Sequence, residues 1–216
     1  MRDAYHDELD AITDQLVEMT ELVGQAITQA TEALLDSDLS IAESVIDGDD
    51  SVDIIRENVD RRTVDLIARQ QPVAGDLRRL TTGLRIASDL ERSGDLAVHV
   101  AKLARRKFPA CAVPNELQAT IREMGEVAAD IVGKAGHVVA GRDADRAAEL
   151  ESDDDVMDHL HRTLLLTMLA PEWPYGVDTA IDLALVGRYY ERFADHAVAV
   201  AKQVVYLVTG ETAMRN

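Results

Sequence analysis

The sequence predicts an all-α protein made of two tandem, pseudo-symmetric three-helix bundles. Three observations support this fold class: apolar residues recur at helical spacing, few segments alternate with period two, and motifs of the first half return in the second. Aromatic residues, which favour strands, make up only 4% of the 216 residues, while apolar residues make up 47% and can fill a core.

Turn signals divide the first half into three predicted helices, over residues 3–36, 39–70 and 74–107. The first has an apolar stripe that consists of Leu9, Ile12, Leu16, Met19, Val23, Ile27, Ala30 and Leu34. It ends at Asp36-Ser37-Asp38, because these residue types favour turns and helix caps. The second ends at Gln71-Pro72 and the third before the segment from Pro109 to Pro114, because proline interrupts a helix.

The second half repeats this arrangement, with predicted helices over residues 115–140, 144–169 and 177–208. Turn signals at Gly141-Arg142-Asp143 and from Pro171 to Gly176 separate them. A shift of 105 residues aligns the pair Asp49/Asp53 with Asp154/Asp158, and a shift of 100 then aligns Glu91-Arg92-x-x-Asp95 with Glu191-Arg192-x-x-Asp195. We therefore predict two units, residues 1–110 and 111–216.

Charge and composition exclude several classes of protein. Lys and Arg number 22 against 40 Asp and Glu, so the net charge is −18 and we expect no nucleic-acid partner. The basic run Lys102–Lys107 is interpreted as the cationic last turn of a helix. Cys111 is the single cysteine, the N-terminal residues lack a signal-peptide core, and no apolar run approaches the roughly 20 residues that span a bilayer. We expect a soluble, cytoplasmic protein.

Carboxylates interrupt the apolar stripes of the third and sixth predicted helices. Glu91/Asp95 and Glu191/Asp195 are each four residues apart and so share one helix face, as do Asp49/Asp53 and Asp154/Asp158. If these pairs face one another, each unit gathers four carboxylates, which requires raised pKa values or a bound hard cation. The alternative is a set of solvated faces neutralised by Arg56, Arg92 or Arg192.

Catalytic motifs are missing from the sequence. A carboxylate-bridged di-metal oxidase usually needs Glu-x-x-His on two helices, and this chain contains none. It also lacks a Gly-x-Ser-x-Gly motif and a P-loop. We therefore predict a protein that is not an enzyme and has no catalytic residues, and keep a metal-free helical adaptor and, less favoured, the di-metal oxidase as alternatives.

Two segments resemble the signature of the PhoU family. They are the run from Leu66 to Arg78, which contains Gln71-Pro72-Val73-Ala74-Gly75-Asp76-Leu77, and Ser88-Asp89-Leu90-Glu91-Arg92-Ser93-Gly94-Asp95. The run Tyr190-Glu191-Arg192-Phe193-Ala194-Asp195-His196 is similar to the second motif of that family. The resemblance covers residues 3–208 and is to members of actinobacterial type.

The resemblance implies a role and a set of residues. Family members are negative regulators of the phosphate-starvation response that connect the ATPase subunit of a phosphate ABC transporter with a phosphate-sensing histidine kinase, usually as homodimers. Some carry Mg, Mn, Fe or Zn at these motifs. The implied metal ligands are Asp49, Asp53, Glu91, Asp95, Asp154, Asp158, Glu191 and Asp195, and the candidate partner-binding residues are Arg78, Arg92 and Arg192. Leu96 replaces a frequent histidine, so we expect the two sites to differ in metal occupancy.

Overall fold

The computed structural model describes residues 2–211, and the side chains of all of these except residues 2–4, 148 and 151. Six helices and no strand occur within that range: α1 (Arg2–Asp36), α2 (Leu39–Gln70), α3 (Ala74–Lys107), α4 (Asn115–Gly141), α5 (Ala144–Met168) and α6 (Gly176–Thr209). The predicted all-α class is confirmed. Among the described residues, no helix is both long and apolar enough to cross a bilayer.

The helix ends explain why the sequence predicted the boundaries so closely. Asp38 begins α2 by accepting a hydrogen bond from the Ile41 backbone N–H at 3.0 Å, and Asp143 begins α5 by accepting one from Arg146 at 3.1 Å. These residues occupy equivalent positions in the two units. Ser37 and Arg142, which precede them, both have positive φ. The duplication therefore extends from the helices to the local chemistry of the turns.

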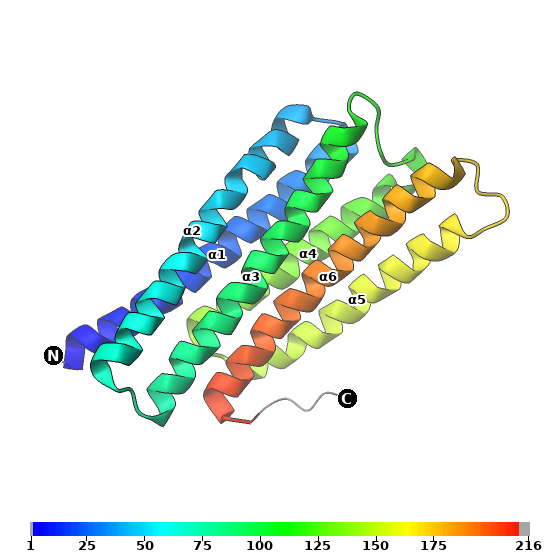
Figure 1. The fold of residues 1–216 in the computed structure, drawn as a ribbon. Coiled ribbons are helices and arrows are strands. Elements are labelled where there is room, and N and C mark those ends of the chain that lie inside the picture. The colour runs from blue at the N-terminus through cyan, green and yellow to red at the C-terminus, as the bar shows by residue number, and fades with distance from the viewer. Residues whose placement is uncertain (1, 212–216) are drawn as a thin grey trace.

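The two units share one core. Helices α1, α2 and α3 pack together, as do α4, α5 and α6, and the units meet through α1 against α4 and α3 against α6 (Figure 1). The four helices α1, α3, α4 and α6 thus form the centre, and α2 and α5 flank it on opposite sides (Figure 1). A single cluster of buried apolar side chains runs through all six helices. A boundary at residue 110 stays a prediction.

The contact between α1 and α4 depends on glycine. A Cβ added to Gly125 would lie 2.5 Å from the Thr31 hydroxyl oxygen, and one added to Gly136 would lie 2.4 Å from that of Thr20. The shift of 105 residues makes Thr20 equivalent to Gly125 and Thr31 equivalent to Gly136. Each contact therefore sets a threonine of the first unit against a glycine of the second, and the two helix surfaces are complementary.

Candidate functional site: two carboxylate clusters

The first cluster lies between α2 and α3. Asp49 of α2 is half-buried, because the neighbouring residues Val45 and Val52 pack into the core, and its carboxylate lies beside Gly94 of α3. Burial is the main cause that raises the pKa of Asp49 to about 6, followed by the charges of Asp95 and Asp53. The charge of Lys102 acts in the opposite direction. This cluster therefore holds excess negative charge in a partly dry position.

The second cluster lies at the equivalent place between α5 and α6. Burial again is the main cause that raises the pKa of Asp154 to about 6, and Asp195 and Asp158 add to it, while Lys202 opposes it. Here Glu191 also contributes, so the other three predicted carboxylates of this cluster all raise the pKa of Asp154. The Oδ1 atom of Asp154 is buried and has no hydrogen-bond partner among the described residues. An unsatisfied buried oxygen of this kind is a position where a cation would be stabilised.

Glu191 has neighbours that its counterpart Glu91 lacks. Burial and the charge of Asp195 raise the pKa of Glu191, while Arg188 and His161 lower it. His161 of α5 packs over Gly187, where an added Cβ would lie 3.1 Å from the imidazole ring. The equivalents of Arg188 and His161 in the first unit are Ser88 and Arg56, and Arg56 pairs with Asp60 at 3.6 Å.

The carboxylates converge less tightly than the sequence predicted. Within the described part of the chain, no three Asp, Glu, His or Cys side chains come close enough to ligate one metal ion. Arginines explain the difference: Arg92 lies 3.7 Å from both Glu91 and Asp95, and Arg188 pairs with Glu191. These ion pairs join Glu91, Asp95 and Glu191 to arginines of their own helix. For Arg92 this agrees with the alternative interpretation, in which the carboxylates form solvated helix faces neutralised by arginine.

The residues of the second cluster fit a cation better than those of the first. Its oxygen donors are of the type that hard divalent cations prefer, and Asp154 supplies an oxygen without a partner. In the first cluster Arg92 lies 3.7 Å from both Glu91 and Asp95. Asp154, Asp158, Glu191 and Asp195 are therefore the residues that would hold a metal ion, after Arg188 has released Glu191.

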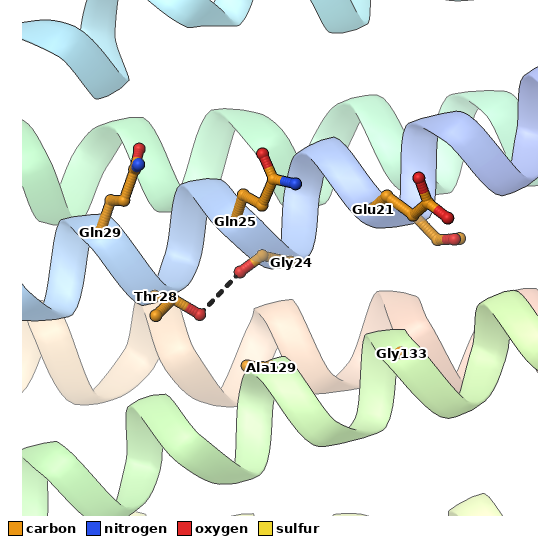
Figure 2. A pocket seen from close by; sticks show the side chains of 8 residues that line it. Glu21, Gly24, Gln25, Thr28, Gln29, Ala129 and Gly133 are labelled. Carbon is orange, nitrogen blue, oxygen red and sulfur yellow. Dashed lines mark hydrogen bonds between the residues drawn. The ribbon is translucent and has the colours of Figure 1, made fainter.

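A groove outside these clusters lies between α1 and α4. It has a volume of about 510 Å³, and Figure 2 shows Glu21, Gln25 and Gln29 of α1 beside Ala129 and Gly133 of α4. The Thr28 hydroxyl donates to the Gly24 carbonyl at 2.8 Å, so its hydrogen-bond donor is already used within α1 (Figure 2). Glu21 is the single ionisable residue of the lining, and the groove therefore offers no group of side chains for chemistry.

The candidate partner-binding arginines lie on one seam, between α3 and α6. The Arg78 guanidinium lies over the Tyr206 ring, 5.7 Å from its centroid, and Arg92 and Arg192 are exposed at equivalent positions of α3 and α6. Sequence reasoning missed that Lys102, Arg105 and Arg106 line a groove on the same seam. The signal that could have found the seam is the arginines at positions 78, 85, 92 and 106 of α3, an interval of seven in which His99 takes the remaining position.

Comparisons with known proteins agree with the fold and the repeat. A family model described as the PhoU domain matches residues 16–104 and 121–204. The "Phosphate-specific transport system accessory protein PhoU homolog 2" of Mycobacterium tuberculosis is 43% identical over 210 residues, which cover 97% of this chain and 99% of that protein. The crystal structure of PhoU from Pseudomonas aeruginosa is similar with a TM-score of 0.85 and 30% identity, over 96% of this chain and 100% of that one.

A second solved structure supports the fold alone. The phosphate transport system regulatory protein PhoU from Streptococcus pneumoniae has a TM-score of 0.87 at 21% identity, over 98% of this chain and 100% of that chain. The similarity therefore extends over the whole arrangement of helices in Figure 1.

Proposed function

This chain belongs to the PhoU family, with mycobacterial relatives that fit the predicted actinobacterial type, and on that premise we propose that it is a non-enzymatic regulator of phosphate uptake. The observation that carries the proposal is the match over 97% of the chain to an accessory protein of the phosphate-specific transport system. Two family matches, one in each unit, support it further. In this role the protein represses the phosphate-starvation response when phosphate is plentiful.

The mode of action that we propose is docking. The protein connects the ATPase subunit of the phosphate ABC transporter with the cytoplasmic part of the phosphate-sensing kinase, acts in the cytoplasm and forms a homodimer. The lack of a Gly-x-Ser-x-Gly motif, a P-loop or a Glu-x-x-His pair supports binding over catalysis. The net charge of −18 supports protein partners over nucleic acid.

The test is a deletion strain together with purified components. Without the gene, alkaline phosphatase should be produced in phosphate-rich medium, and the purified protein should bind the ATPase subunit, the kinase fragment, or both, more weakly as salt rises. Light scattering should give the mass of a dimer, and duplex DNA should not bind at physiological ionic strength. Unchanged phosphatase output in the deletion strain would refute the regulatory role.

We propose further that the second cluster binds divalent or trivalent metal ions (Mg, Mn, Fe or Zn) through Asp154, Asp158, Glu191 and Asp195. The first cluster, formed by Asp49, Asp53, Glu91 and Asp95, binds them more weakly. The unsatisfied oxygen of Asp154 and the mutual repulsion within the second cluster support this order. A metal ion bound there would neutralise the charge of these carboxylates.

A pair of matched double variants tests the metal proposal. Glu191→Ala/Asp195→Ala should abolish Mn²⁺ uptake by the second unit, whereas Glu91→Ala/Asp95→Ala should remove the weaker uptake of the first. Elemental analysis of protein purified without chelator and titration with Mn²⁺ provide the measurements. If the wild-type protein binds no metal at saturating Mn²⁺ or Fe, the metal-free adaptor replaces the metal-binding one. The ion pairs of Arg92 and Arg188 favour that second function.

A further inference from the structure

Charge is divided unequally between the helices. Helices α3 and α6 together contain 11 Lys and Arg against 8 Asp and Glu, whereas the rest of the chain contains 11 against 32. These two helices pack side by side in the middle of the face that Figure 1 presents, with α2 and α5 at its edges. These two helices therefore carry a net positive charge in an otherwise acidic protein. We call the cations along their junction the α3/α6 stripe: Arg78, Arg85, Arg92, Arg105 and Arg106 of α3, and Arg192 of α6.

The cations of α3 follow one line along the helix. Basic residues recur at intervals of seven, which keeps them on nearly one side of a helix. They are Arg78, Arg85, Arg92 and Arg106, and His99 occupies the remaining position of the series. Contacts show that this line faces α6: Arg85 lies over the Tyr206 ring, the His99 ring is 5.2 Å from that of Tyr189, and Arg106 pairs with Asp182.

The stripe is hollowed at one end. A groove of about 370 Å³ lies between the C-terminal part of α3 and the N-terminal part of α6, lined by Lys102, Arg105 and Leu185 among others. Leu185 is 43% exposed and the adjacent Ile181 is 53% exposed. Asp182 at the base of the groove is buried and already paired with Arg106 and Lys107. The groove thus offers apolar surface beside cations and little free negative charge.

Several of these cations are available to a ligand. Arg105 and Arg192 are exposed and form no ion pair with any described residue, and Arg85 makes only the contact with Tyr206. Arg92 is 63% exposed and its ion pairs are long, at 3.7 Å. Exposed pairs of this kind contribute on the order of 0–1 kcal/mol and are readily exchanged for a better partner.

We propose that the α3/α6 stripe is a docking surface for an acidic amphipathic helix of a partner protein. Its acidic side chains would meet the cations of α3 and α6, and its apolar side chains would contact Ile181 and Leu185. Helix-in-groove binding of this kind uses anchors at helical spacing, which the interval of seven on α3 matches. The identity of the partner rests on the proposed function; the chemistry of the surface does not.

The flanking carboxylates favour a narrow ligand. Asp49 and Asp95 lie on the α2 side of the stripe, and Asp154 and Asp195 lie on the α5 side. A flat anionic membrane or a DNA duplex would approach these carboxylates together with the cations and be repelled. A single helix, about 10 Å wide with its side chains, can contact Arg85 and Arg192 without lying over Asp49 or Asp154, and it takes Arg92 from its long ion pairs with Glu91 and Asp95. The geometry therefore selects a helix over a surface.

A charge-reversal triple variant tests the stripe without reference to any partner. The probe is a synthetic amphipathic peptide with Leu on one face and Glu beside it, and a second peptide has Gln in place of Glu. Arg85→Glu/Arg92→Glu/Arg192→Glu should weaken binding of the Glu peptide about ten-fold or more, measured by fluorescence anisotropy. The control Arg61→Glu/Arg122→Glu/Arg162→Glu makes the same change in net charge at exposed positions outside the stripe and should retain affinity within about two-fold.

The remaining outcomes separate this inference from the proposed function. A neutral triple variant, with Gln at the three stripe positions, should lose part of the affinity. It keeps the test valid if circular dichroism shows that the Glu variant does not fold.

Equal binding of the Glu and Gln peptides, or stripe-dependent binding to phosphatidylglycerol vesicles without peptide binding, overturns the docking surface. If the ATPase subunit or the kinase fragment binds wild type and stripe variant equally, the regulatory function stands and the surface is wrong. If the peptide binds in a stripe-dependent manner but neither the ATPase subunit nor the kinase fragment binds, the docking surface stands and the proposed adaptor function is wrong.

Discussion

Asp49 and Asp154 occupy the same position in the two units and are half-buried by the same packing, yet their surroundings differ. In the first unit Arg92 spans Glu91 and Asp95, and the residue equivalent to His161 is a permanent cation, Arg56. In the second unit Glu191 adds to the repulsion on Asp154, one of whose oxygens has no partner. Both clusters therefore hold excess negative charge on the same backbone plan, but only the second has a buried Asp154 oxygen without a partner among the described residues.

The α1/α4 contact shows the same divergence in the core. Threonine belongs to the first unit and glycine to the second at both contacts, so the first unit facing a copy of itself would set threonine against threonine. The second facing itself would leave two glycines opposite one another. The duplicated units have thus become complementary to each other, and neither is complementary to itself.

Breaking this complementarity should give the largest effect. Gly136→Thr puts a side chain where a Cβ already lies 2.4 Å from the Thr20 hydroxyl oxygen, and should lower the free energy of unfolding by about 3 kcal/mol. Adding Thr20→Gly in the same chain restores the space and should recover most of the loss, because the exchange leaves the number of helical glycines unchanged. Urea denaturation followed by circular dichroism measures both.

The matched control for this experiment is Gly133→Ala on the exposed side of α4. A Cβ there meets no heavy atom within 4 Å, so the variant should gain about 0.5–1 kcal/mol from helix propensity. The explanation by close packing would be wrong if Gly136→Thr and Gly133→Ala changed stability by similar amounts, or if Thr20→Gly gave no rescue.

Exchanging His161 and Arg56, the equivalent residues beside the two clusters, should bring the Mn²⁺ affinities of the clusters closer together. His161→Arg places a permanent cation near Glu191, as Arg56 is placed in the first unit, and should weaken Mn²⁺ binding by the second unit about ten-fold through charge repulsion. The reciprocal Arg56→His should strengthen binding by the first unit. Titration calorimetry in chains whose other cluster carries the double alanine substitution isolates each site. Identical affinities of the wild-type clusters would contradict the asymmetry.

The sequence was sufficient for the helices and insufficient for their side-chain chemistry. Proline at 72 and aspartate caps at 38 and 143 act locally, so the predicted helix ends lie within a residue or so of those observed. The position of the carboxylate pairs also followed from helical periodicity. Their incomplete convergence did not, because Arg92 and Arg188 compete for the same oxygens and rotamers carry no sequence signal. The α3/α6 stripe was hidden for a related reason: Lys102–Lys107 also suits a helix end, and only the packing of α6 beside it creates a groove.

Titration of the half-buried Asp49 and Asp154 should have an intermediate effect on the stability of the metal-free protein. Their pKa values are raised to about 6, so the folded state holds protons that the unfolded chain releases, and the stabilisation present below about pH 4 is lost as pH rises through 6. Asp49→Asn and Asp154→Asn should therefore stabilise the protein by about 1 kcal/mol at neutral pH, after allowance for solvent screening, and by almost nothing near pH 4. The gain should be greater at Asp154, because Glu191 adds to its repulsion.

Denaturation curves in EDTA at a series of pH values check this, with Asp47→Asn at an exposed position of α2 as the control for a change in net charge. A gain at Asp47 equal to that at Asp49 would mean that overall charge, and not the local cluster, governs the effect.

The smallest effect concerns the buried hydroxyl of Tyr190, which has no counterpart at the equivalent position of the first unit. Tyr190 is fully buried, and the pKa of its hydroxyl is raised by that burial, so it stays protonated. Its hydroxyl lies 2.7 Å from that of Thr31, which itself donates to the Ile27 carbonyl at 2.7 Å, so Tyr190 must be the donor of the pair. The first unit has Leu90 at the equivalent position, also fully buried, which shows that the site accepts an apolar side chain.

Tyr190→Phe should therefore lower the free energy of unfolding by about 0.5 kcal/mol, at the lower end for a lost hydrogen bond, because Thr31 keeps its bond to Ile27. Thr31→Val should cost more, since it leaves the Tyr190 hydroxyl buried without an acceptor, and the double variant should cost less than the sum of the two. A double-mutant cycle by urea denaturation measures this coupling between α1 and α6. Strictly additive costs would show that the hydroxyl pair does not link the two units, and the comparison would then rest on the glycine contacts alone.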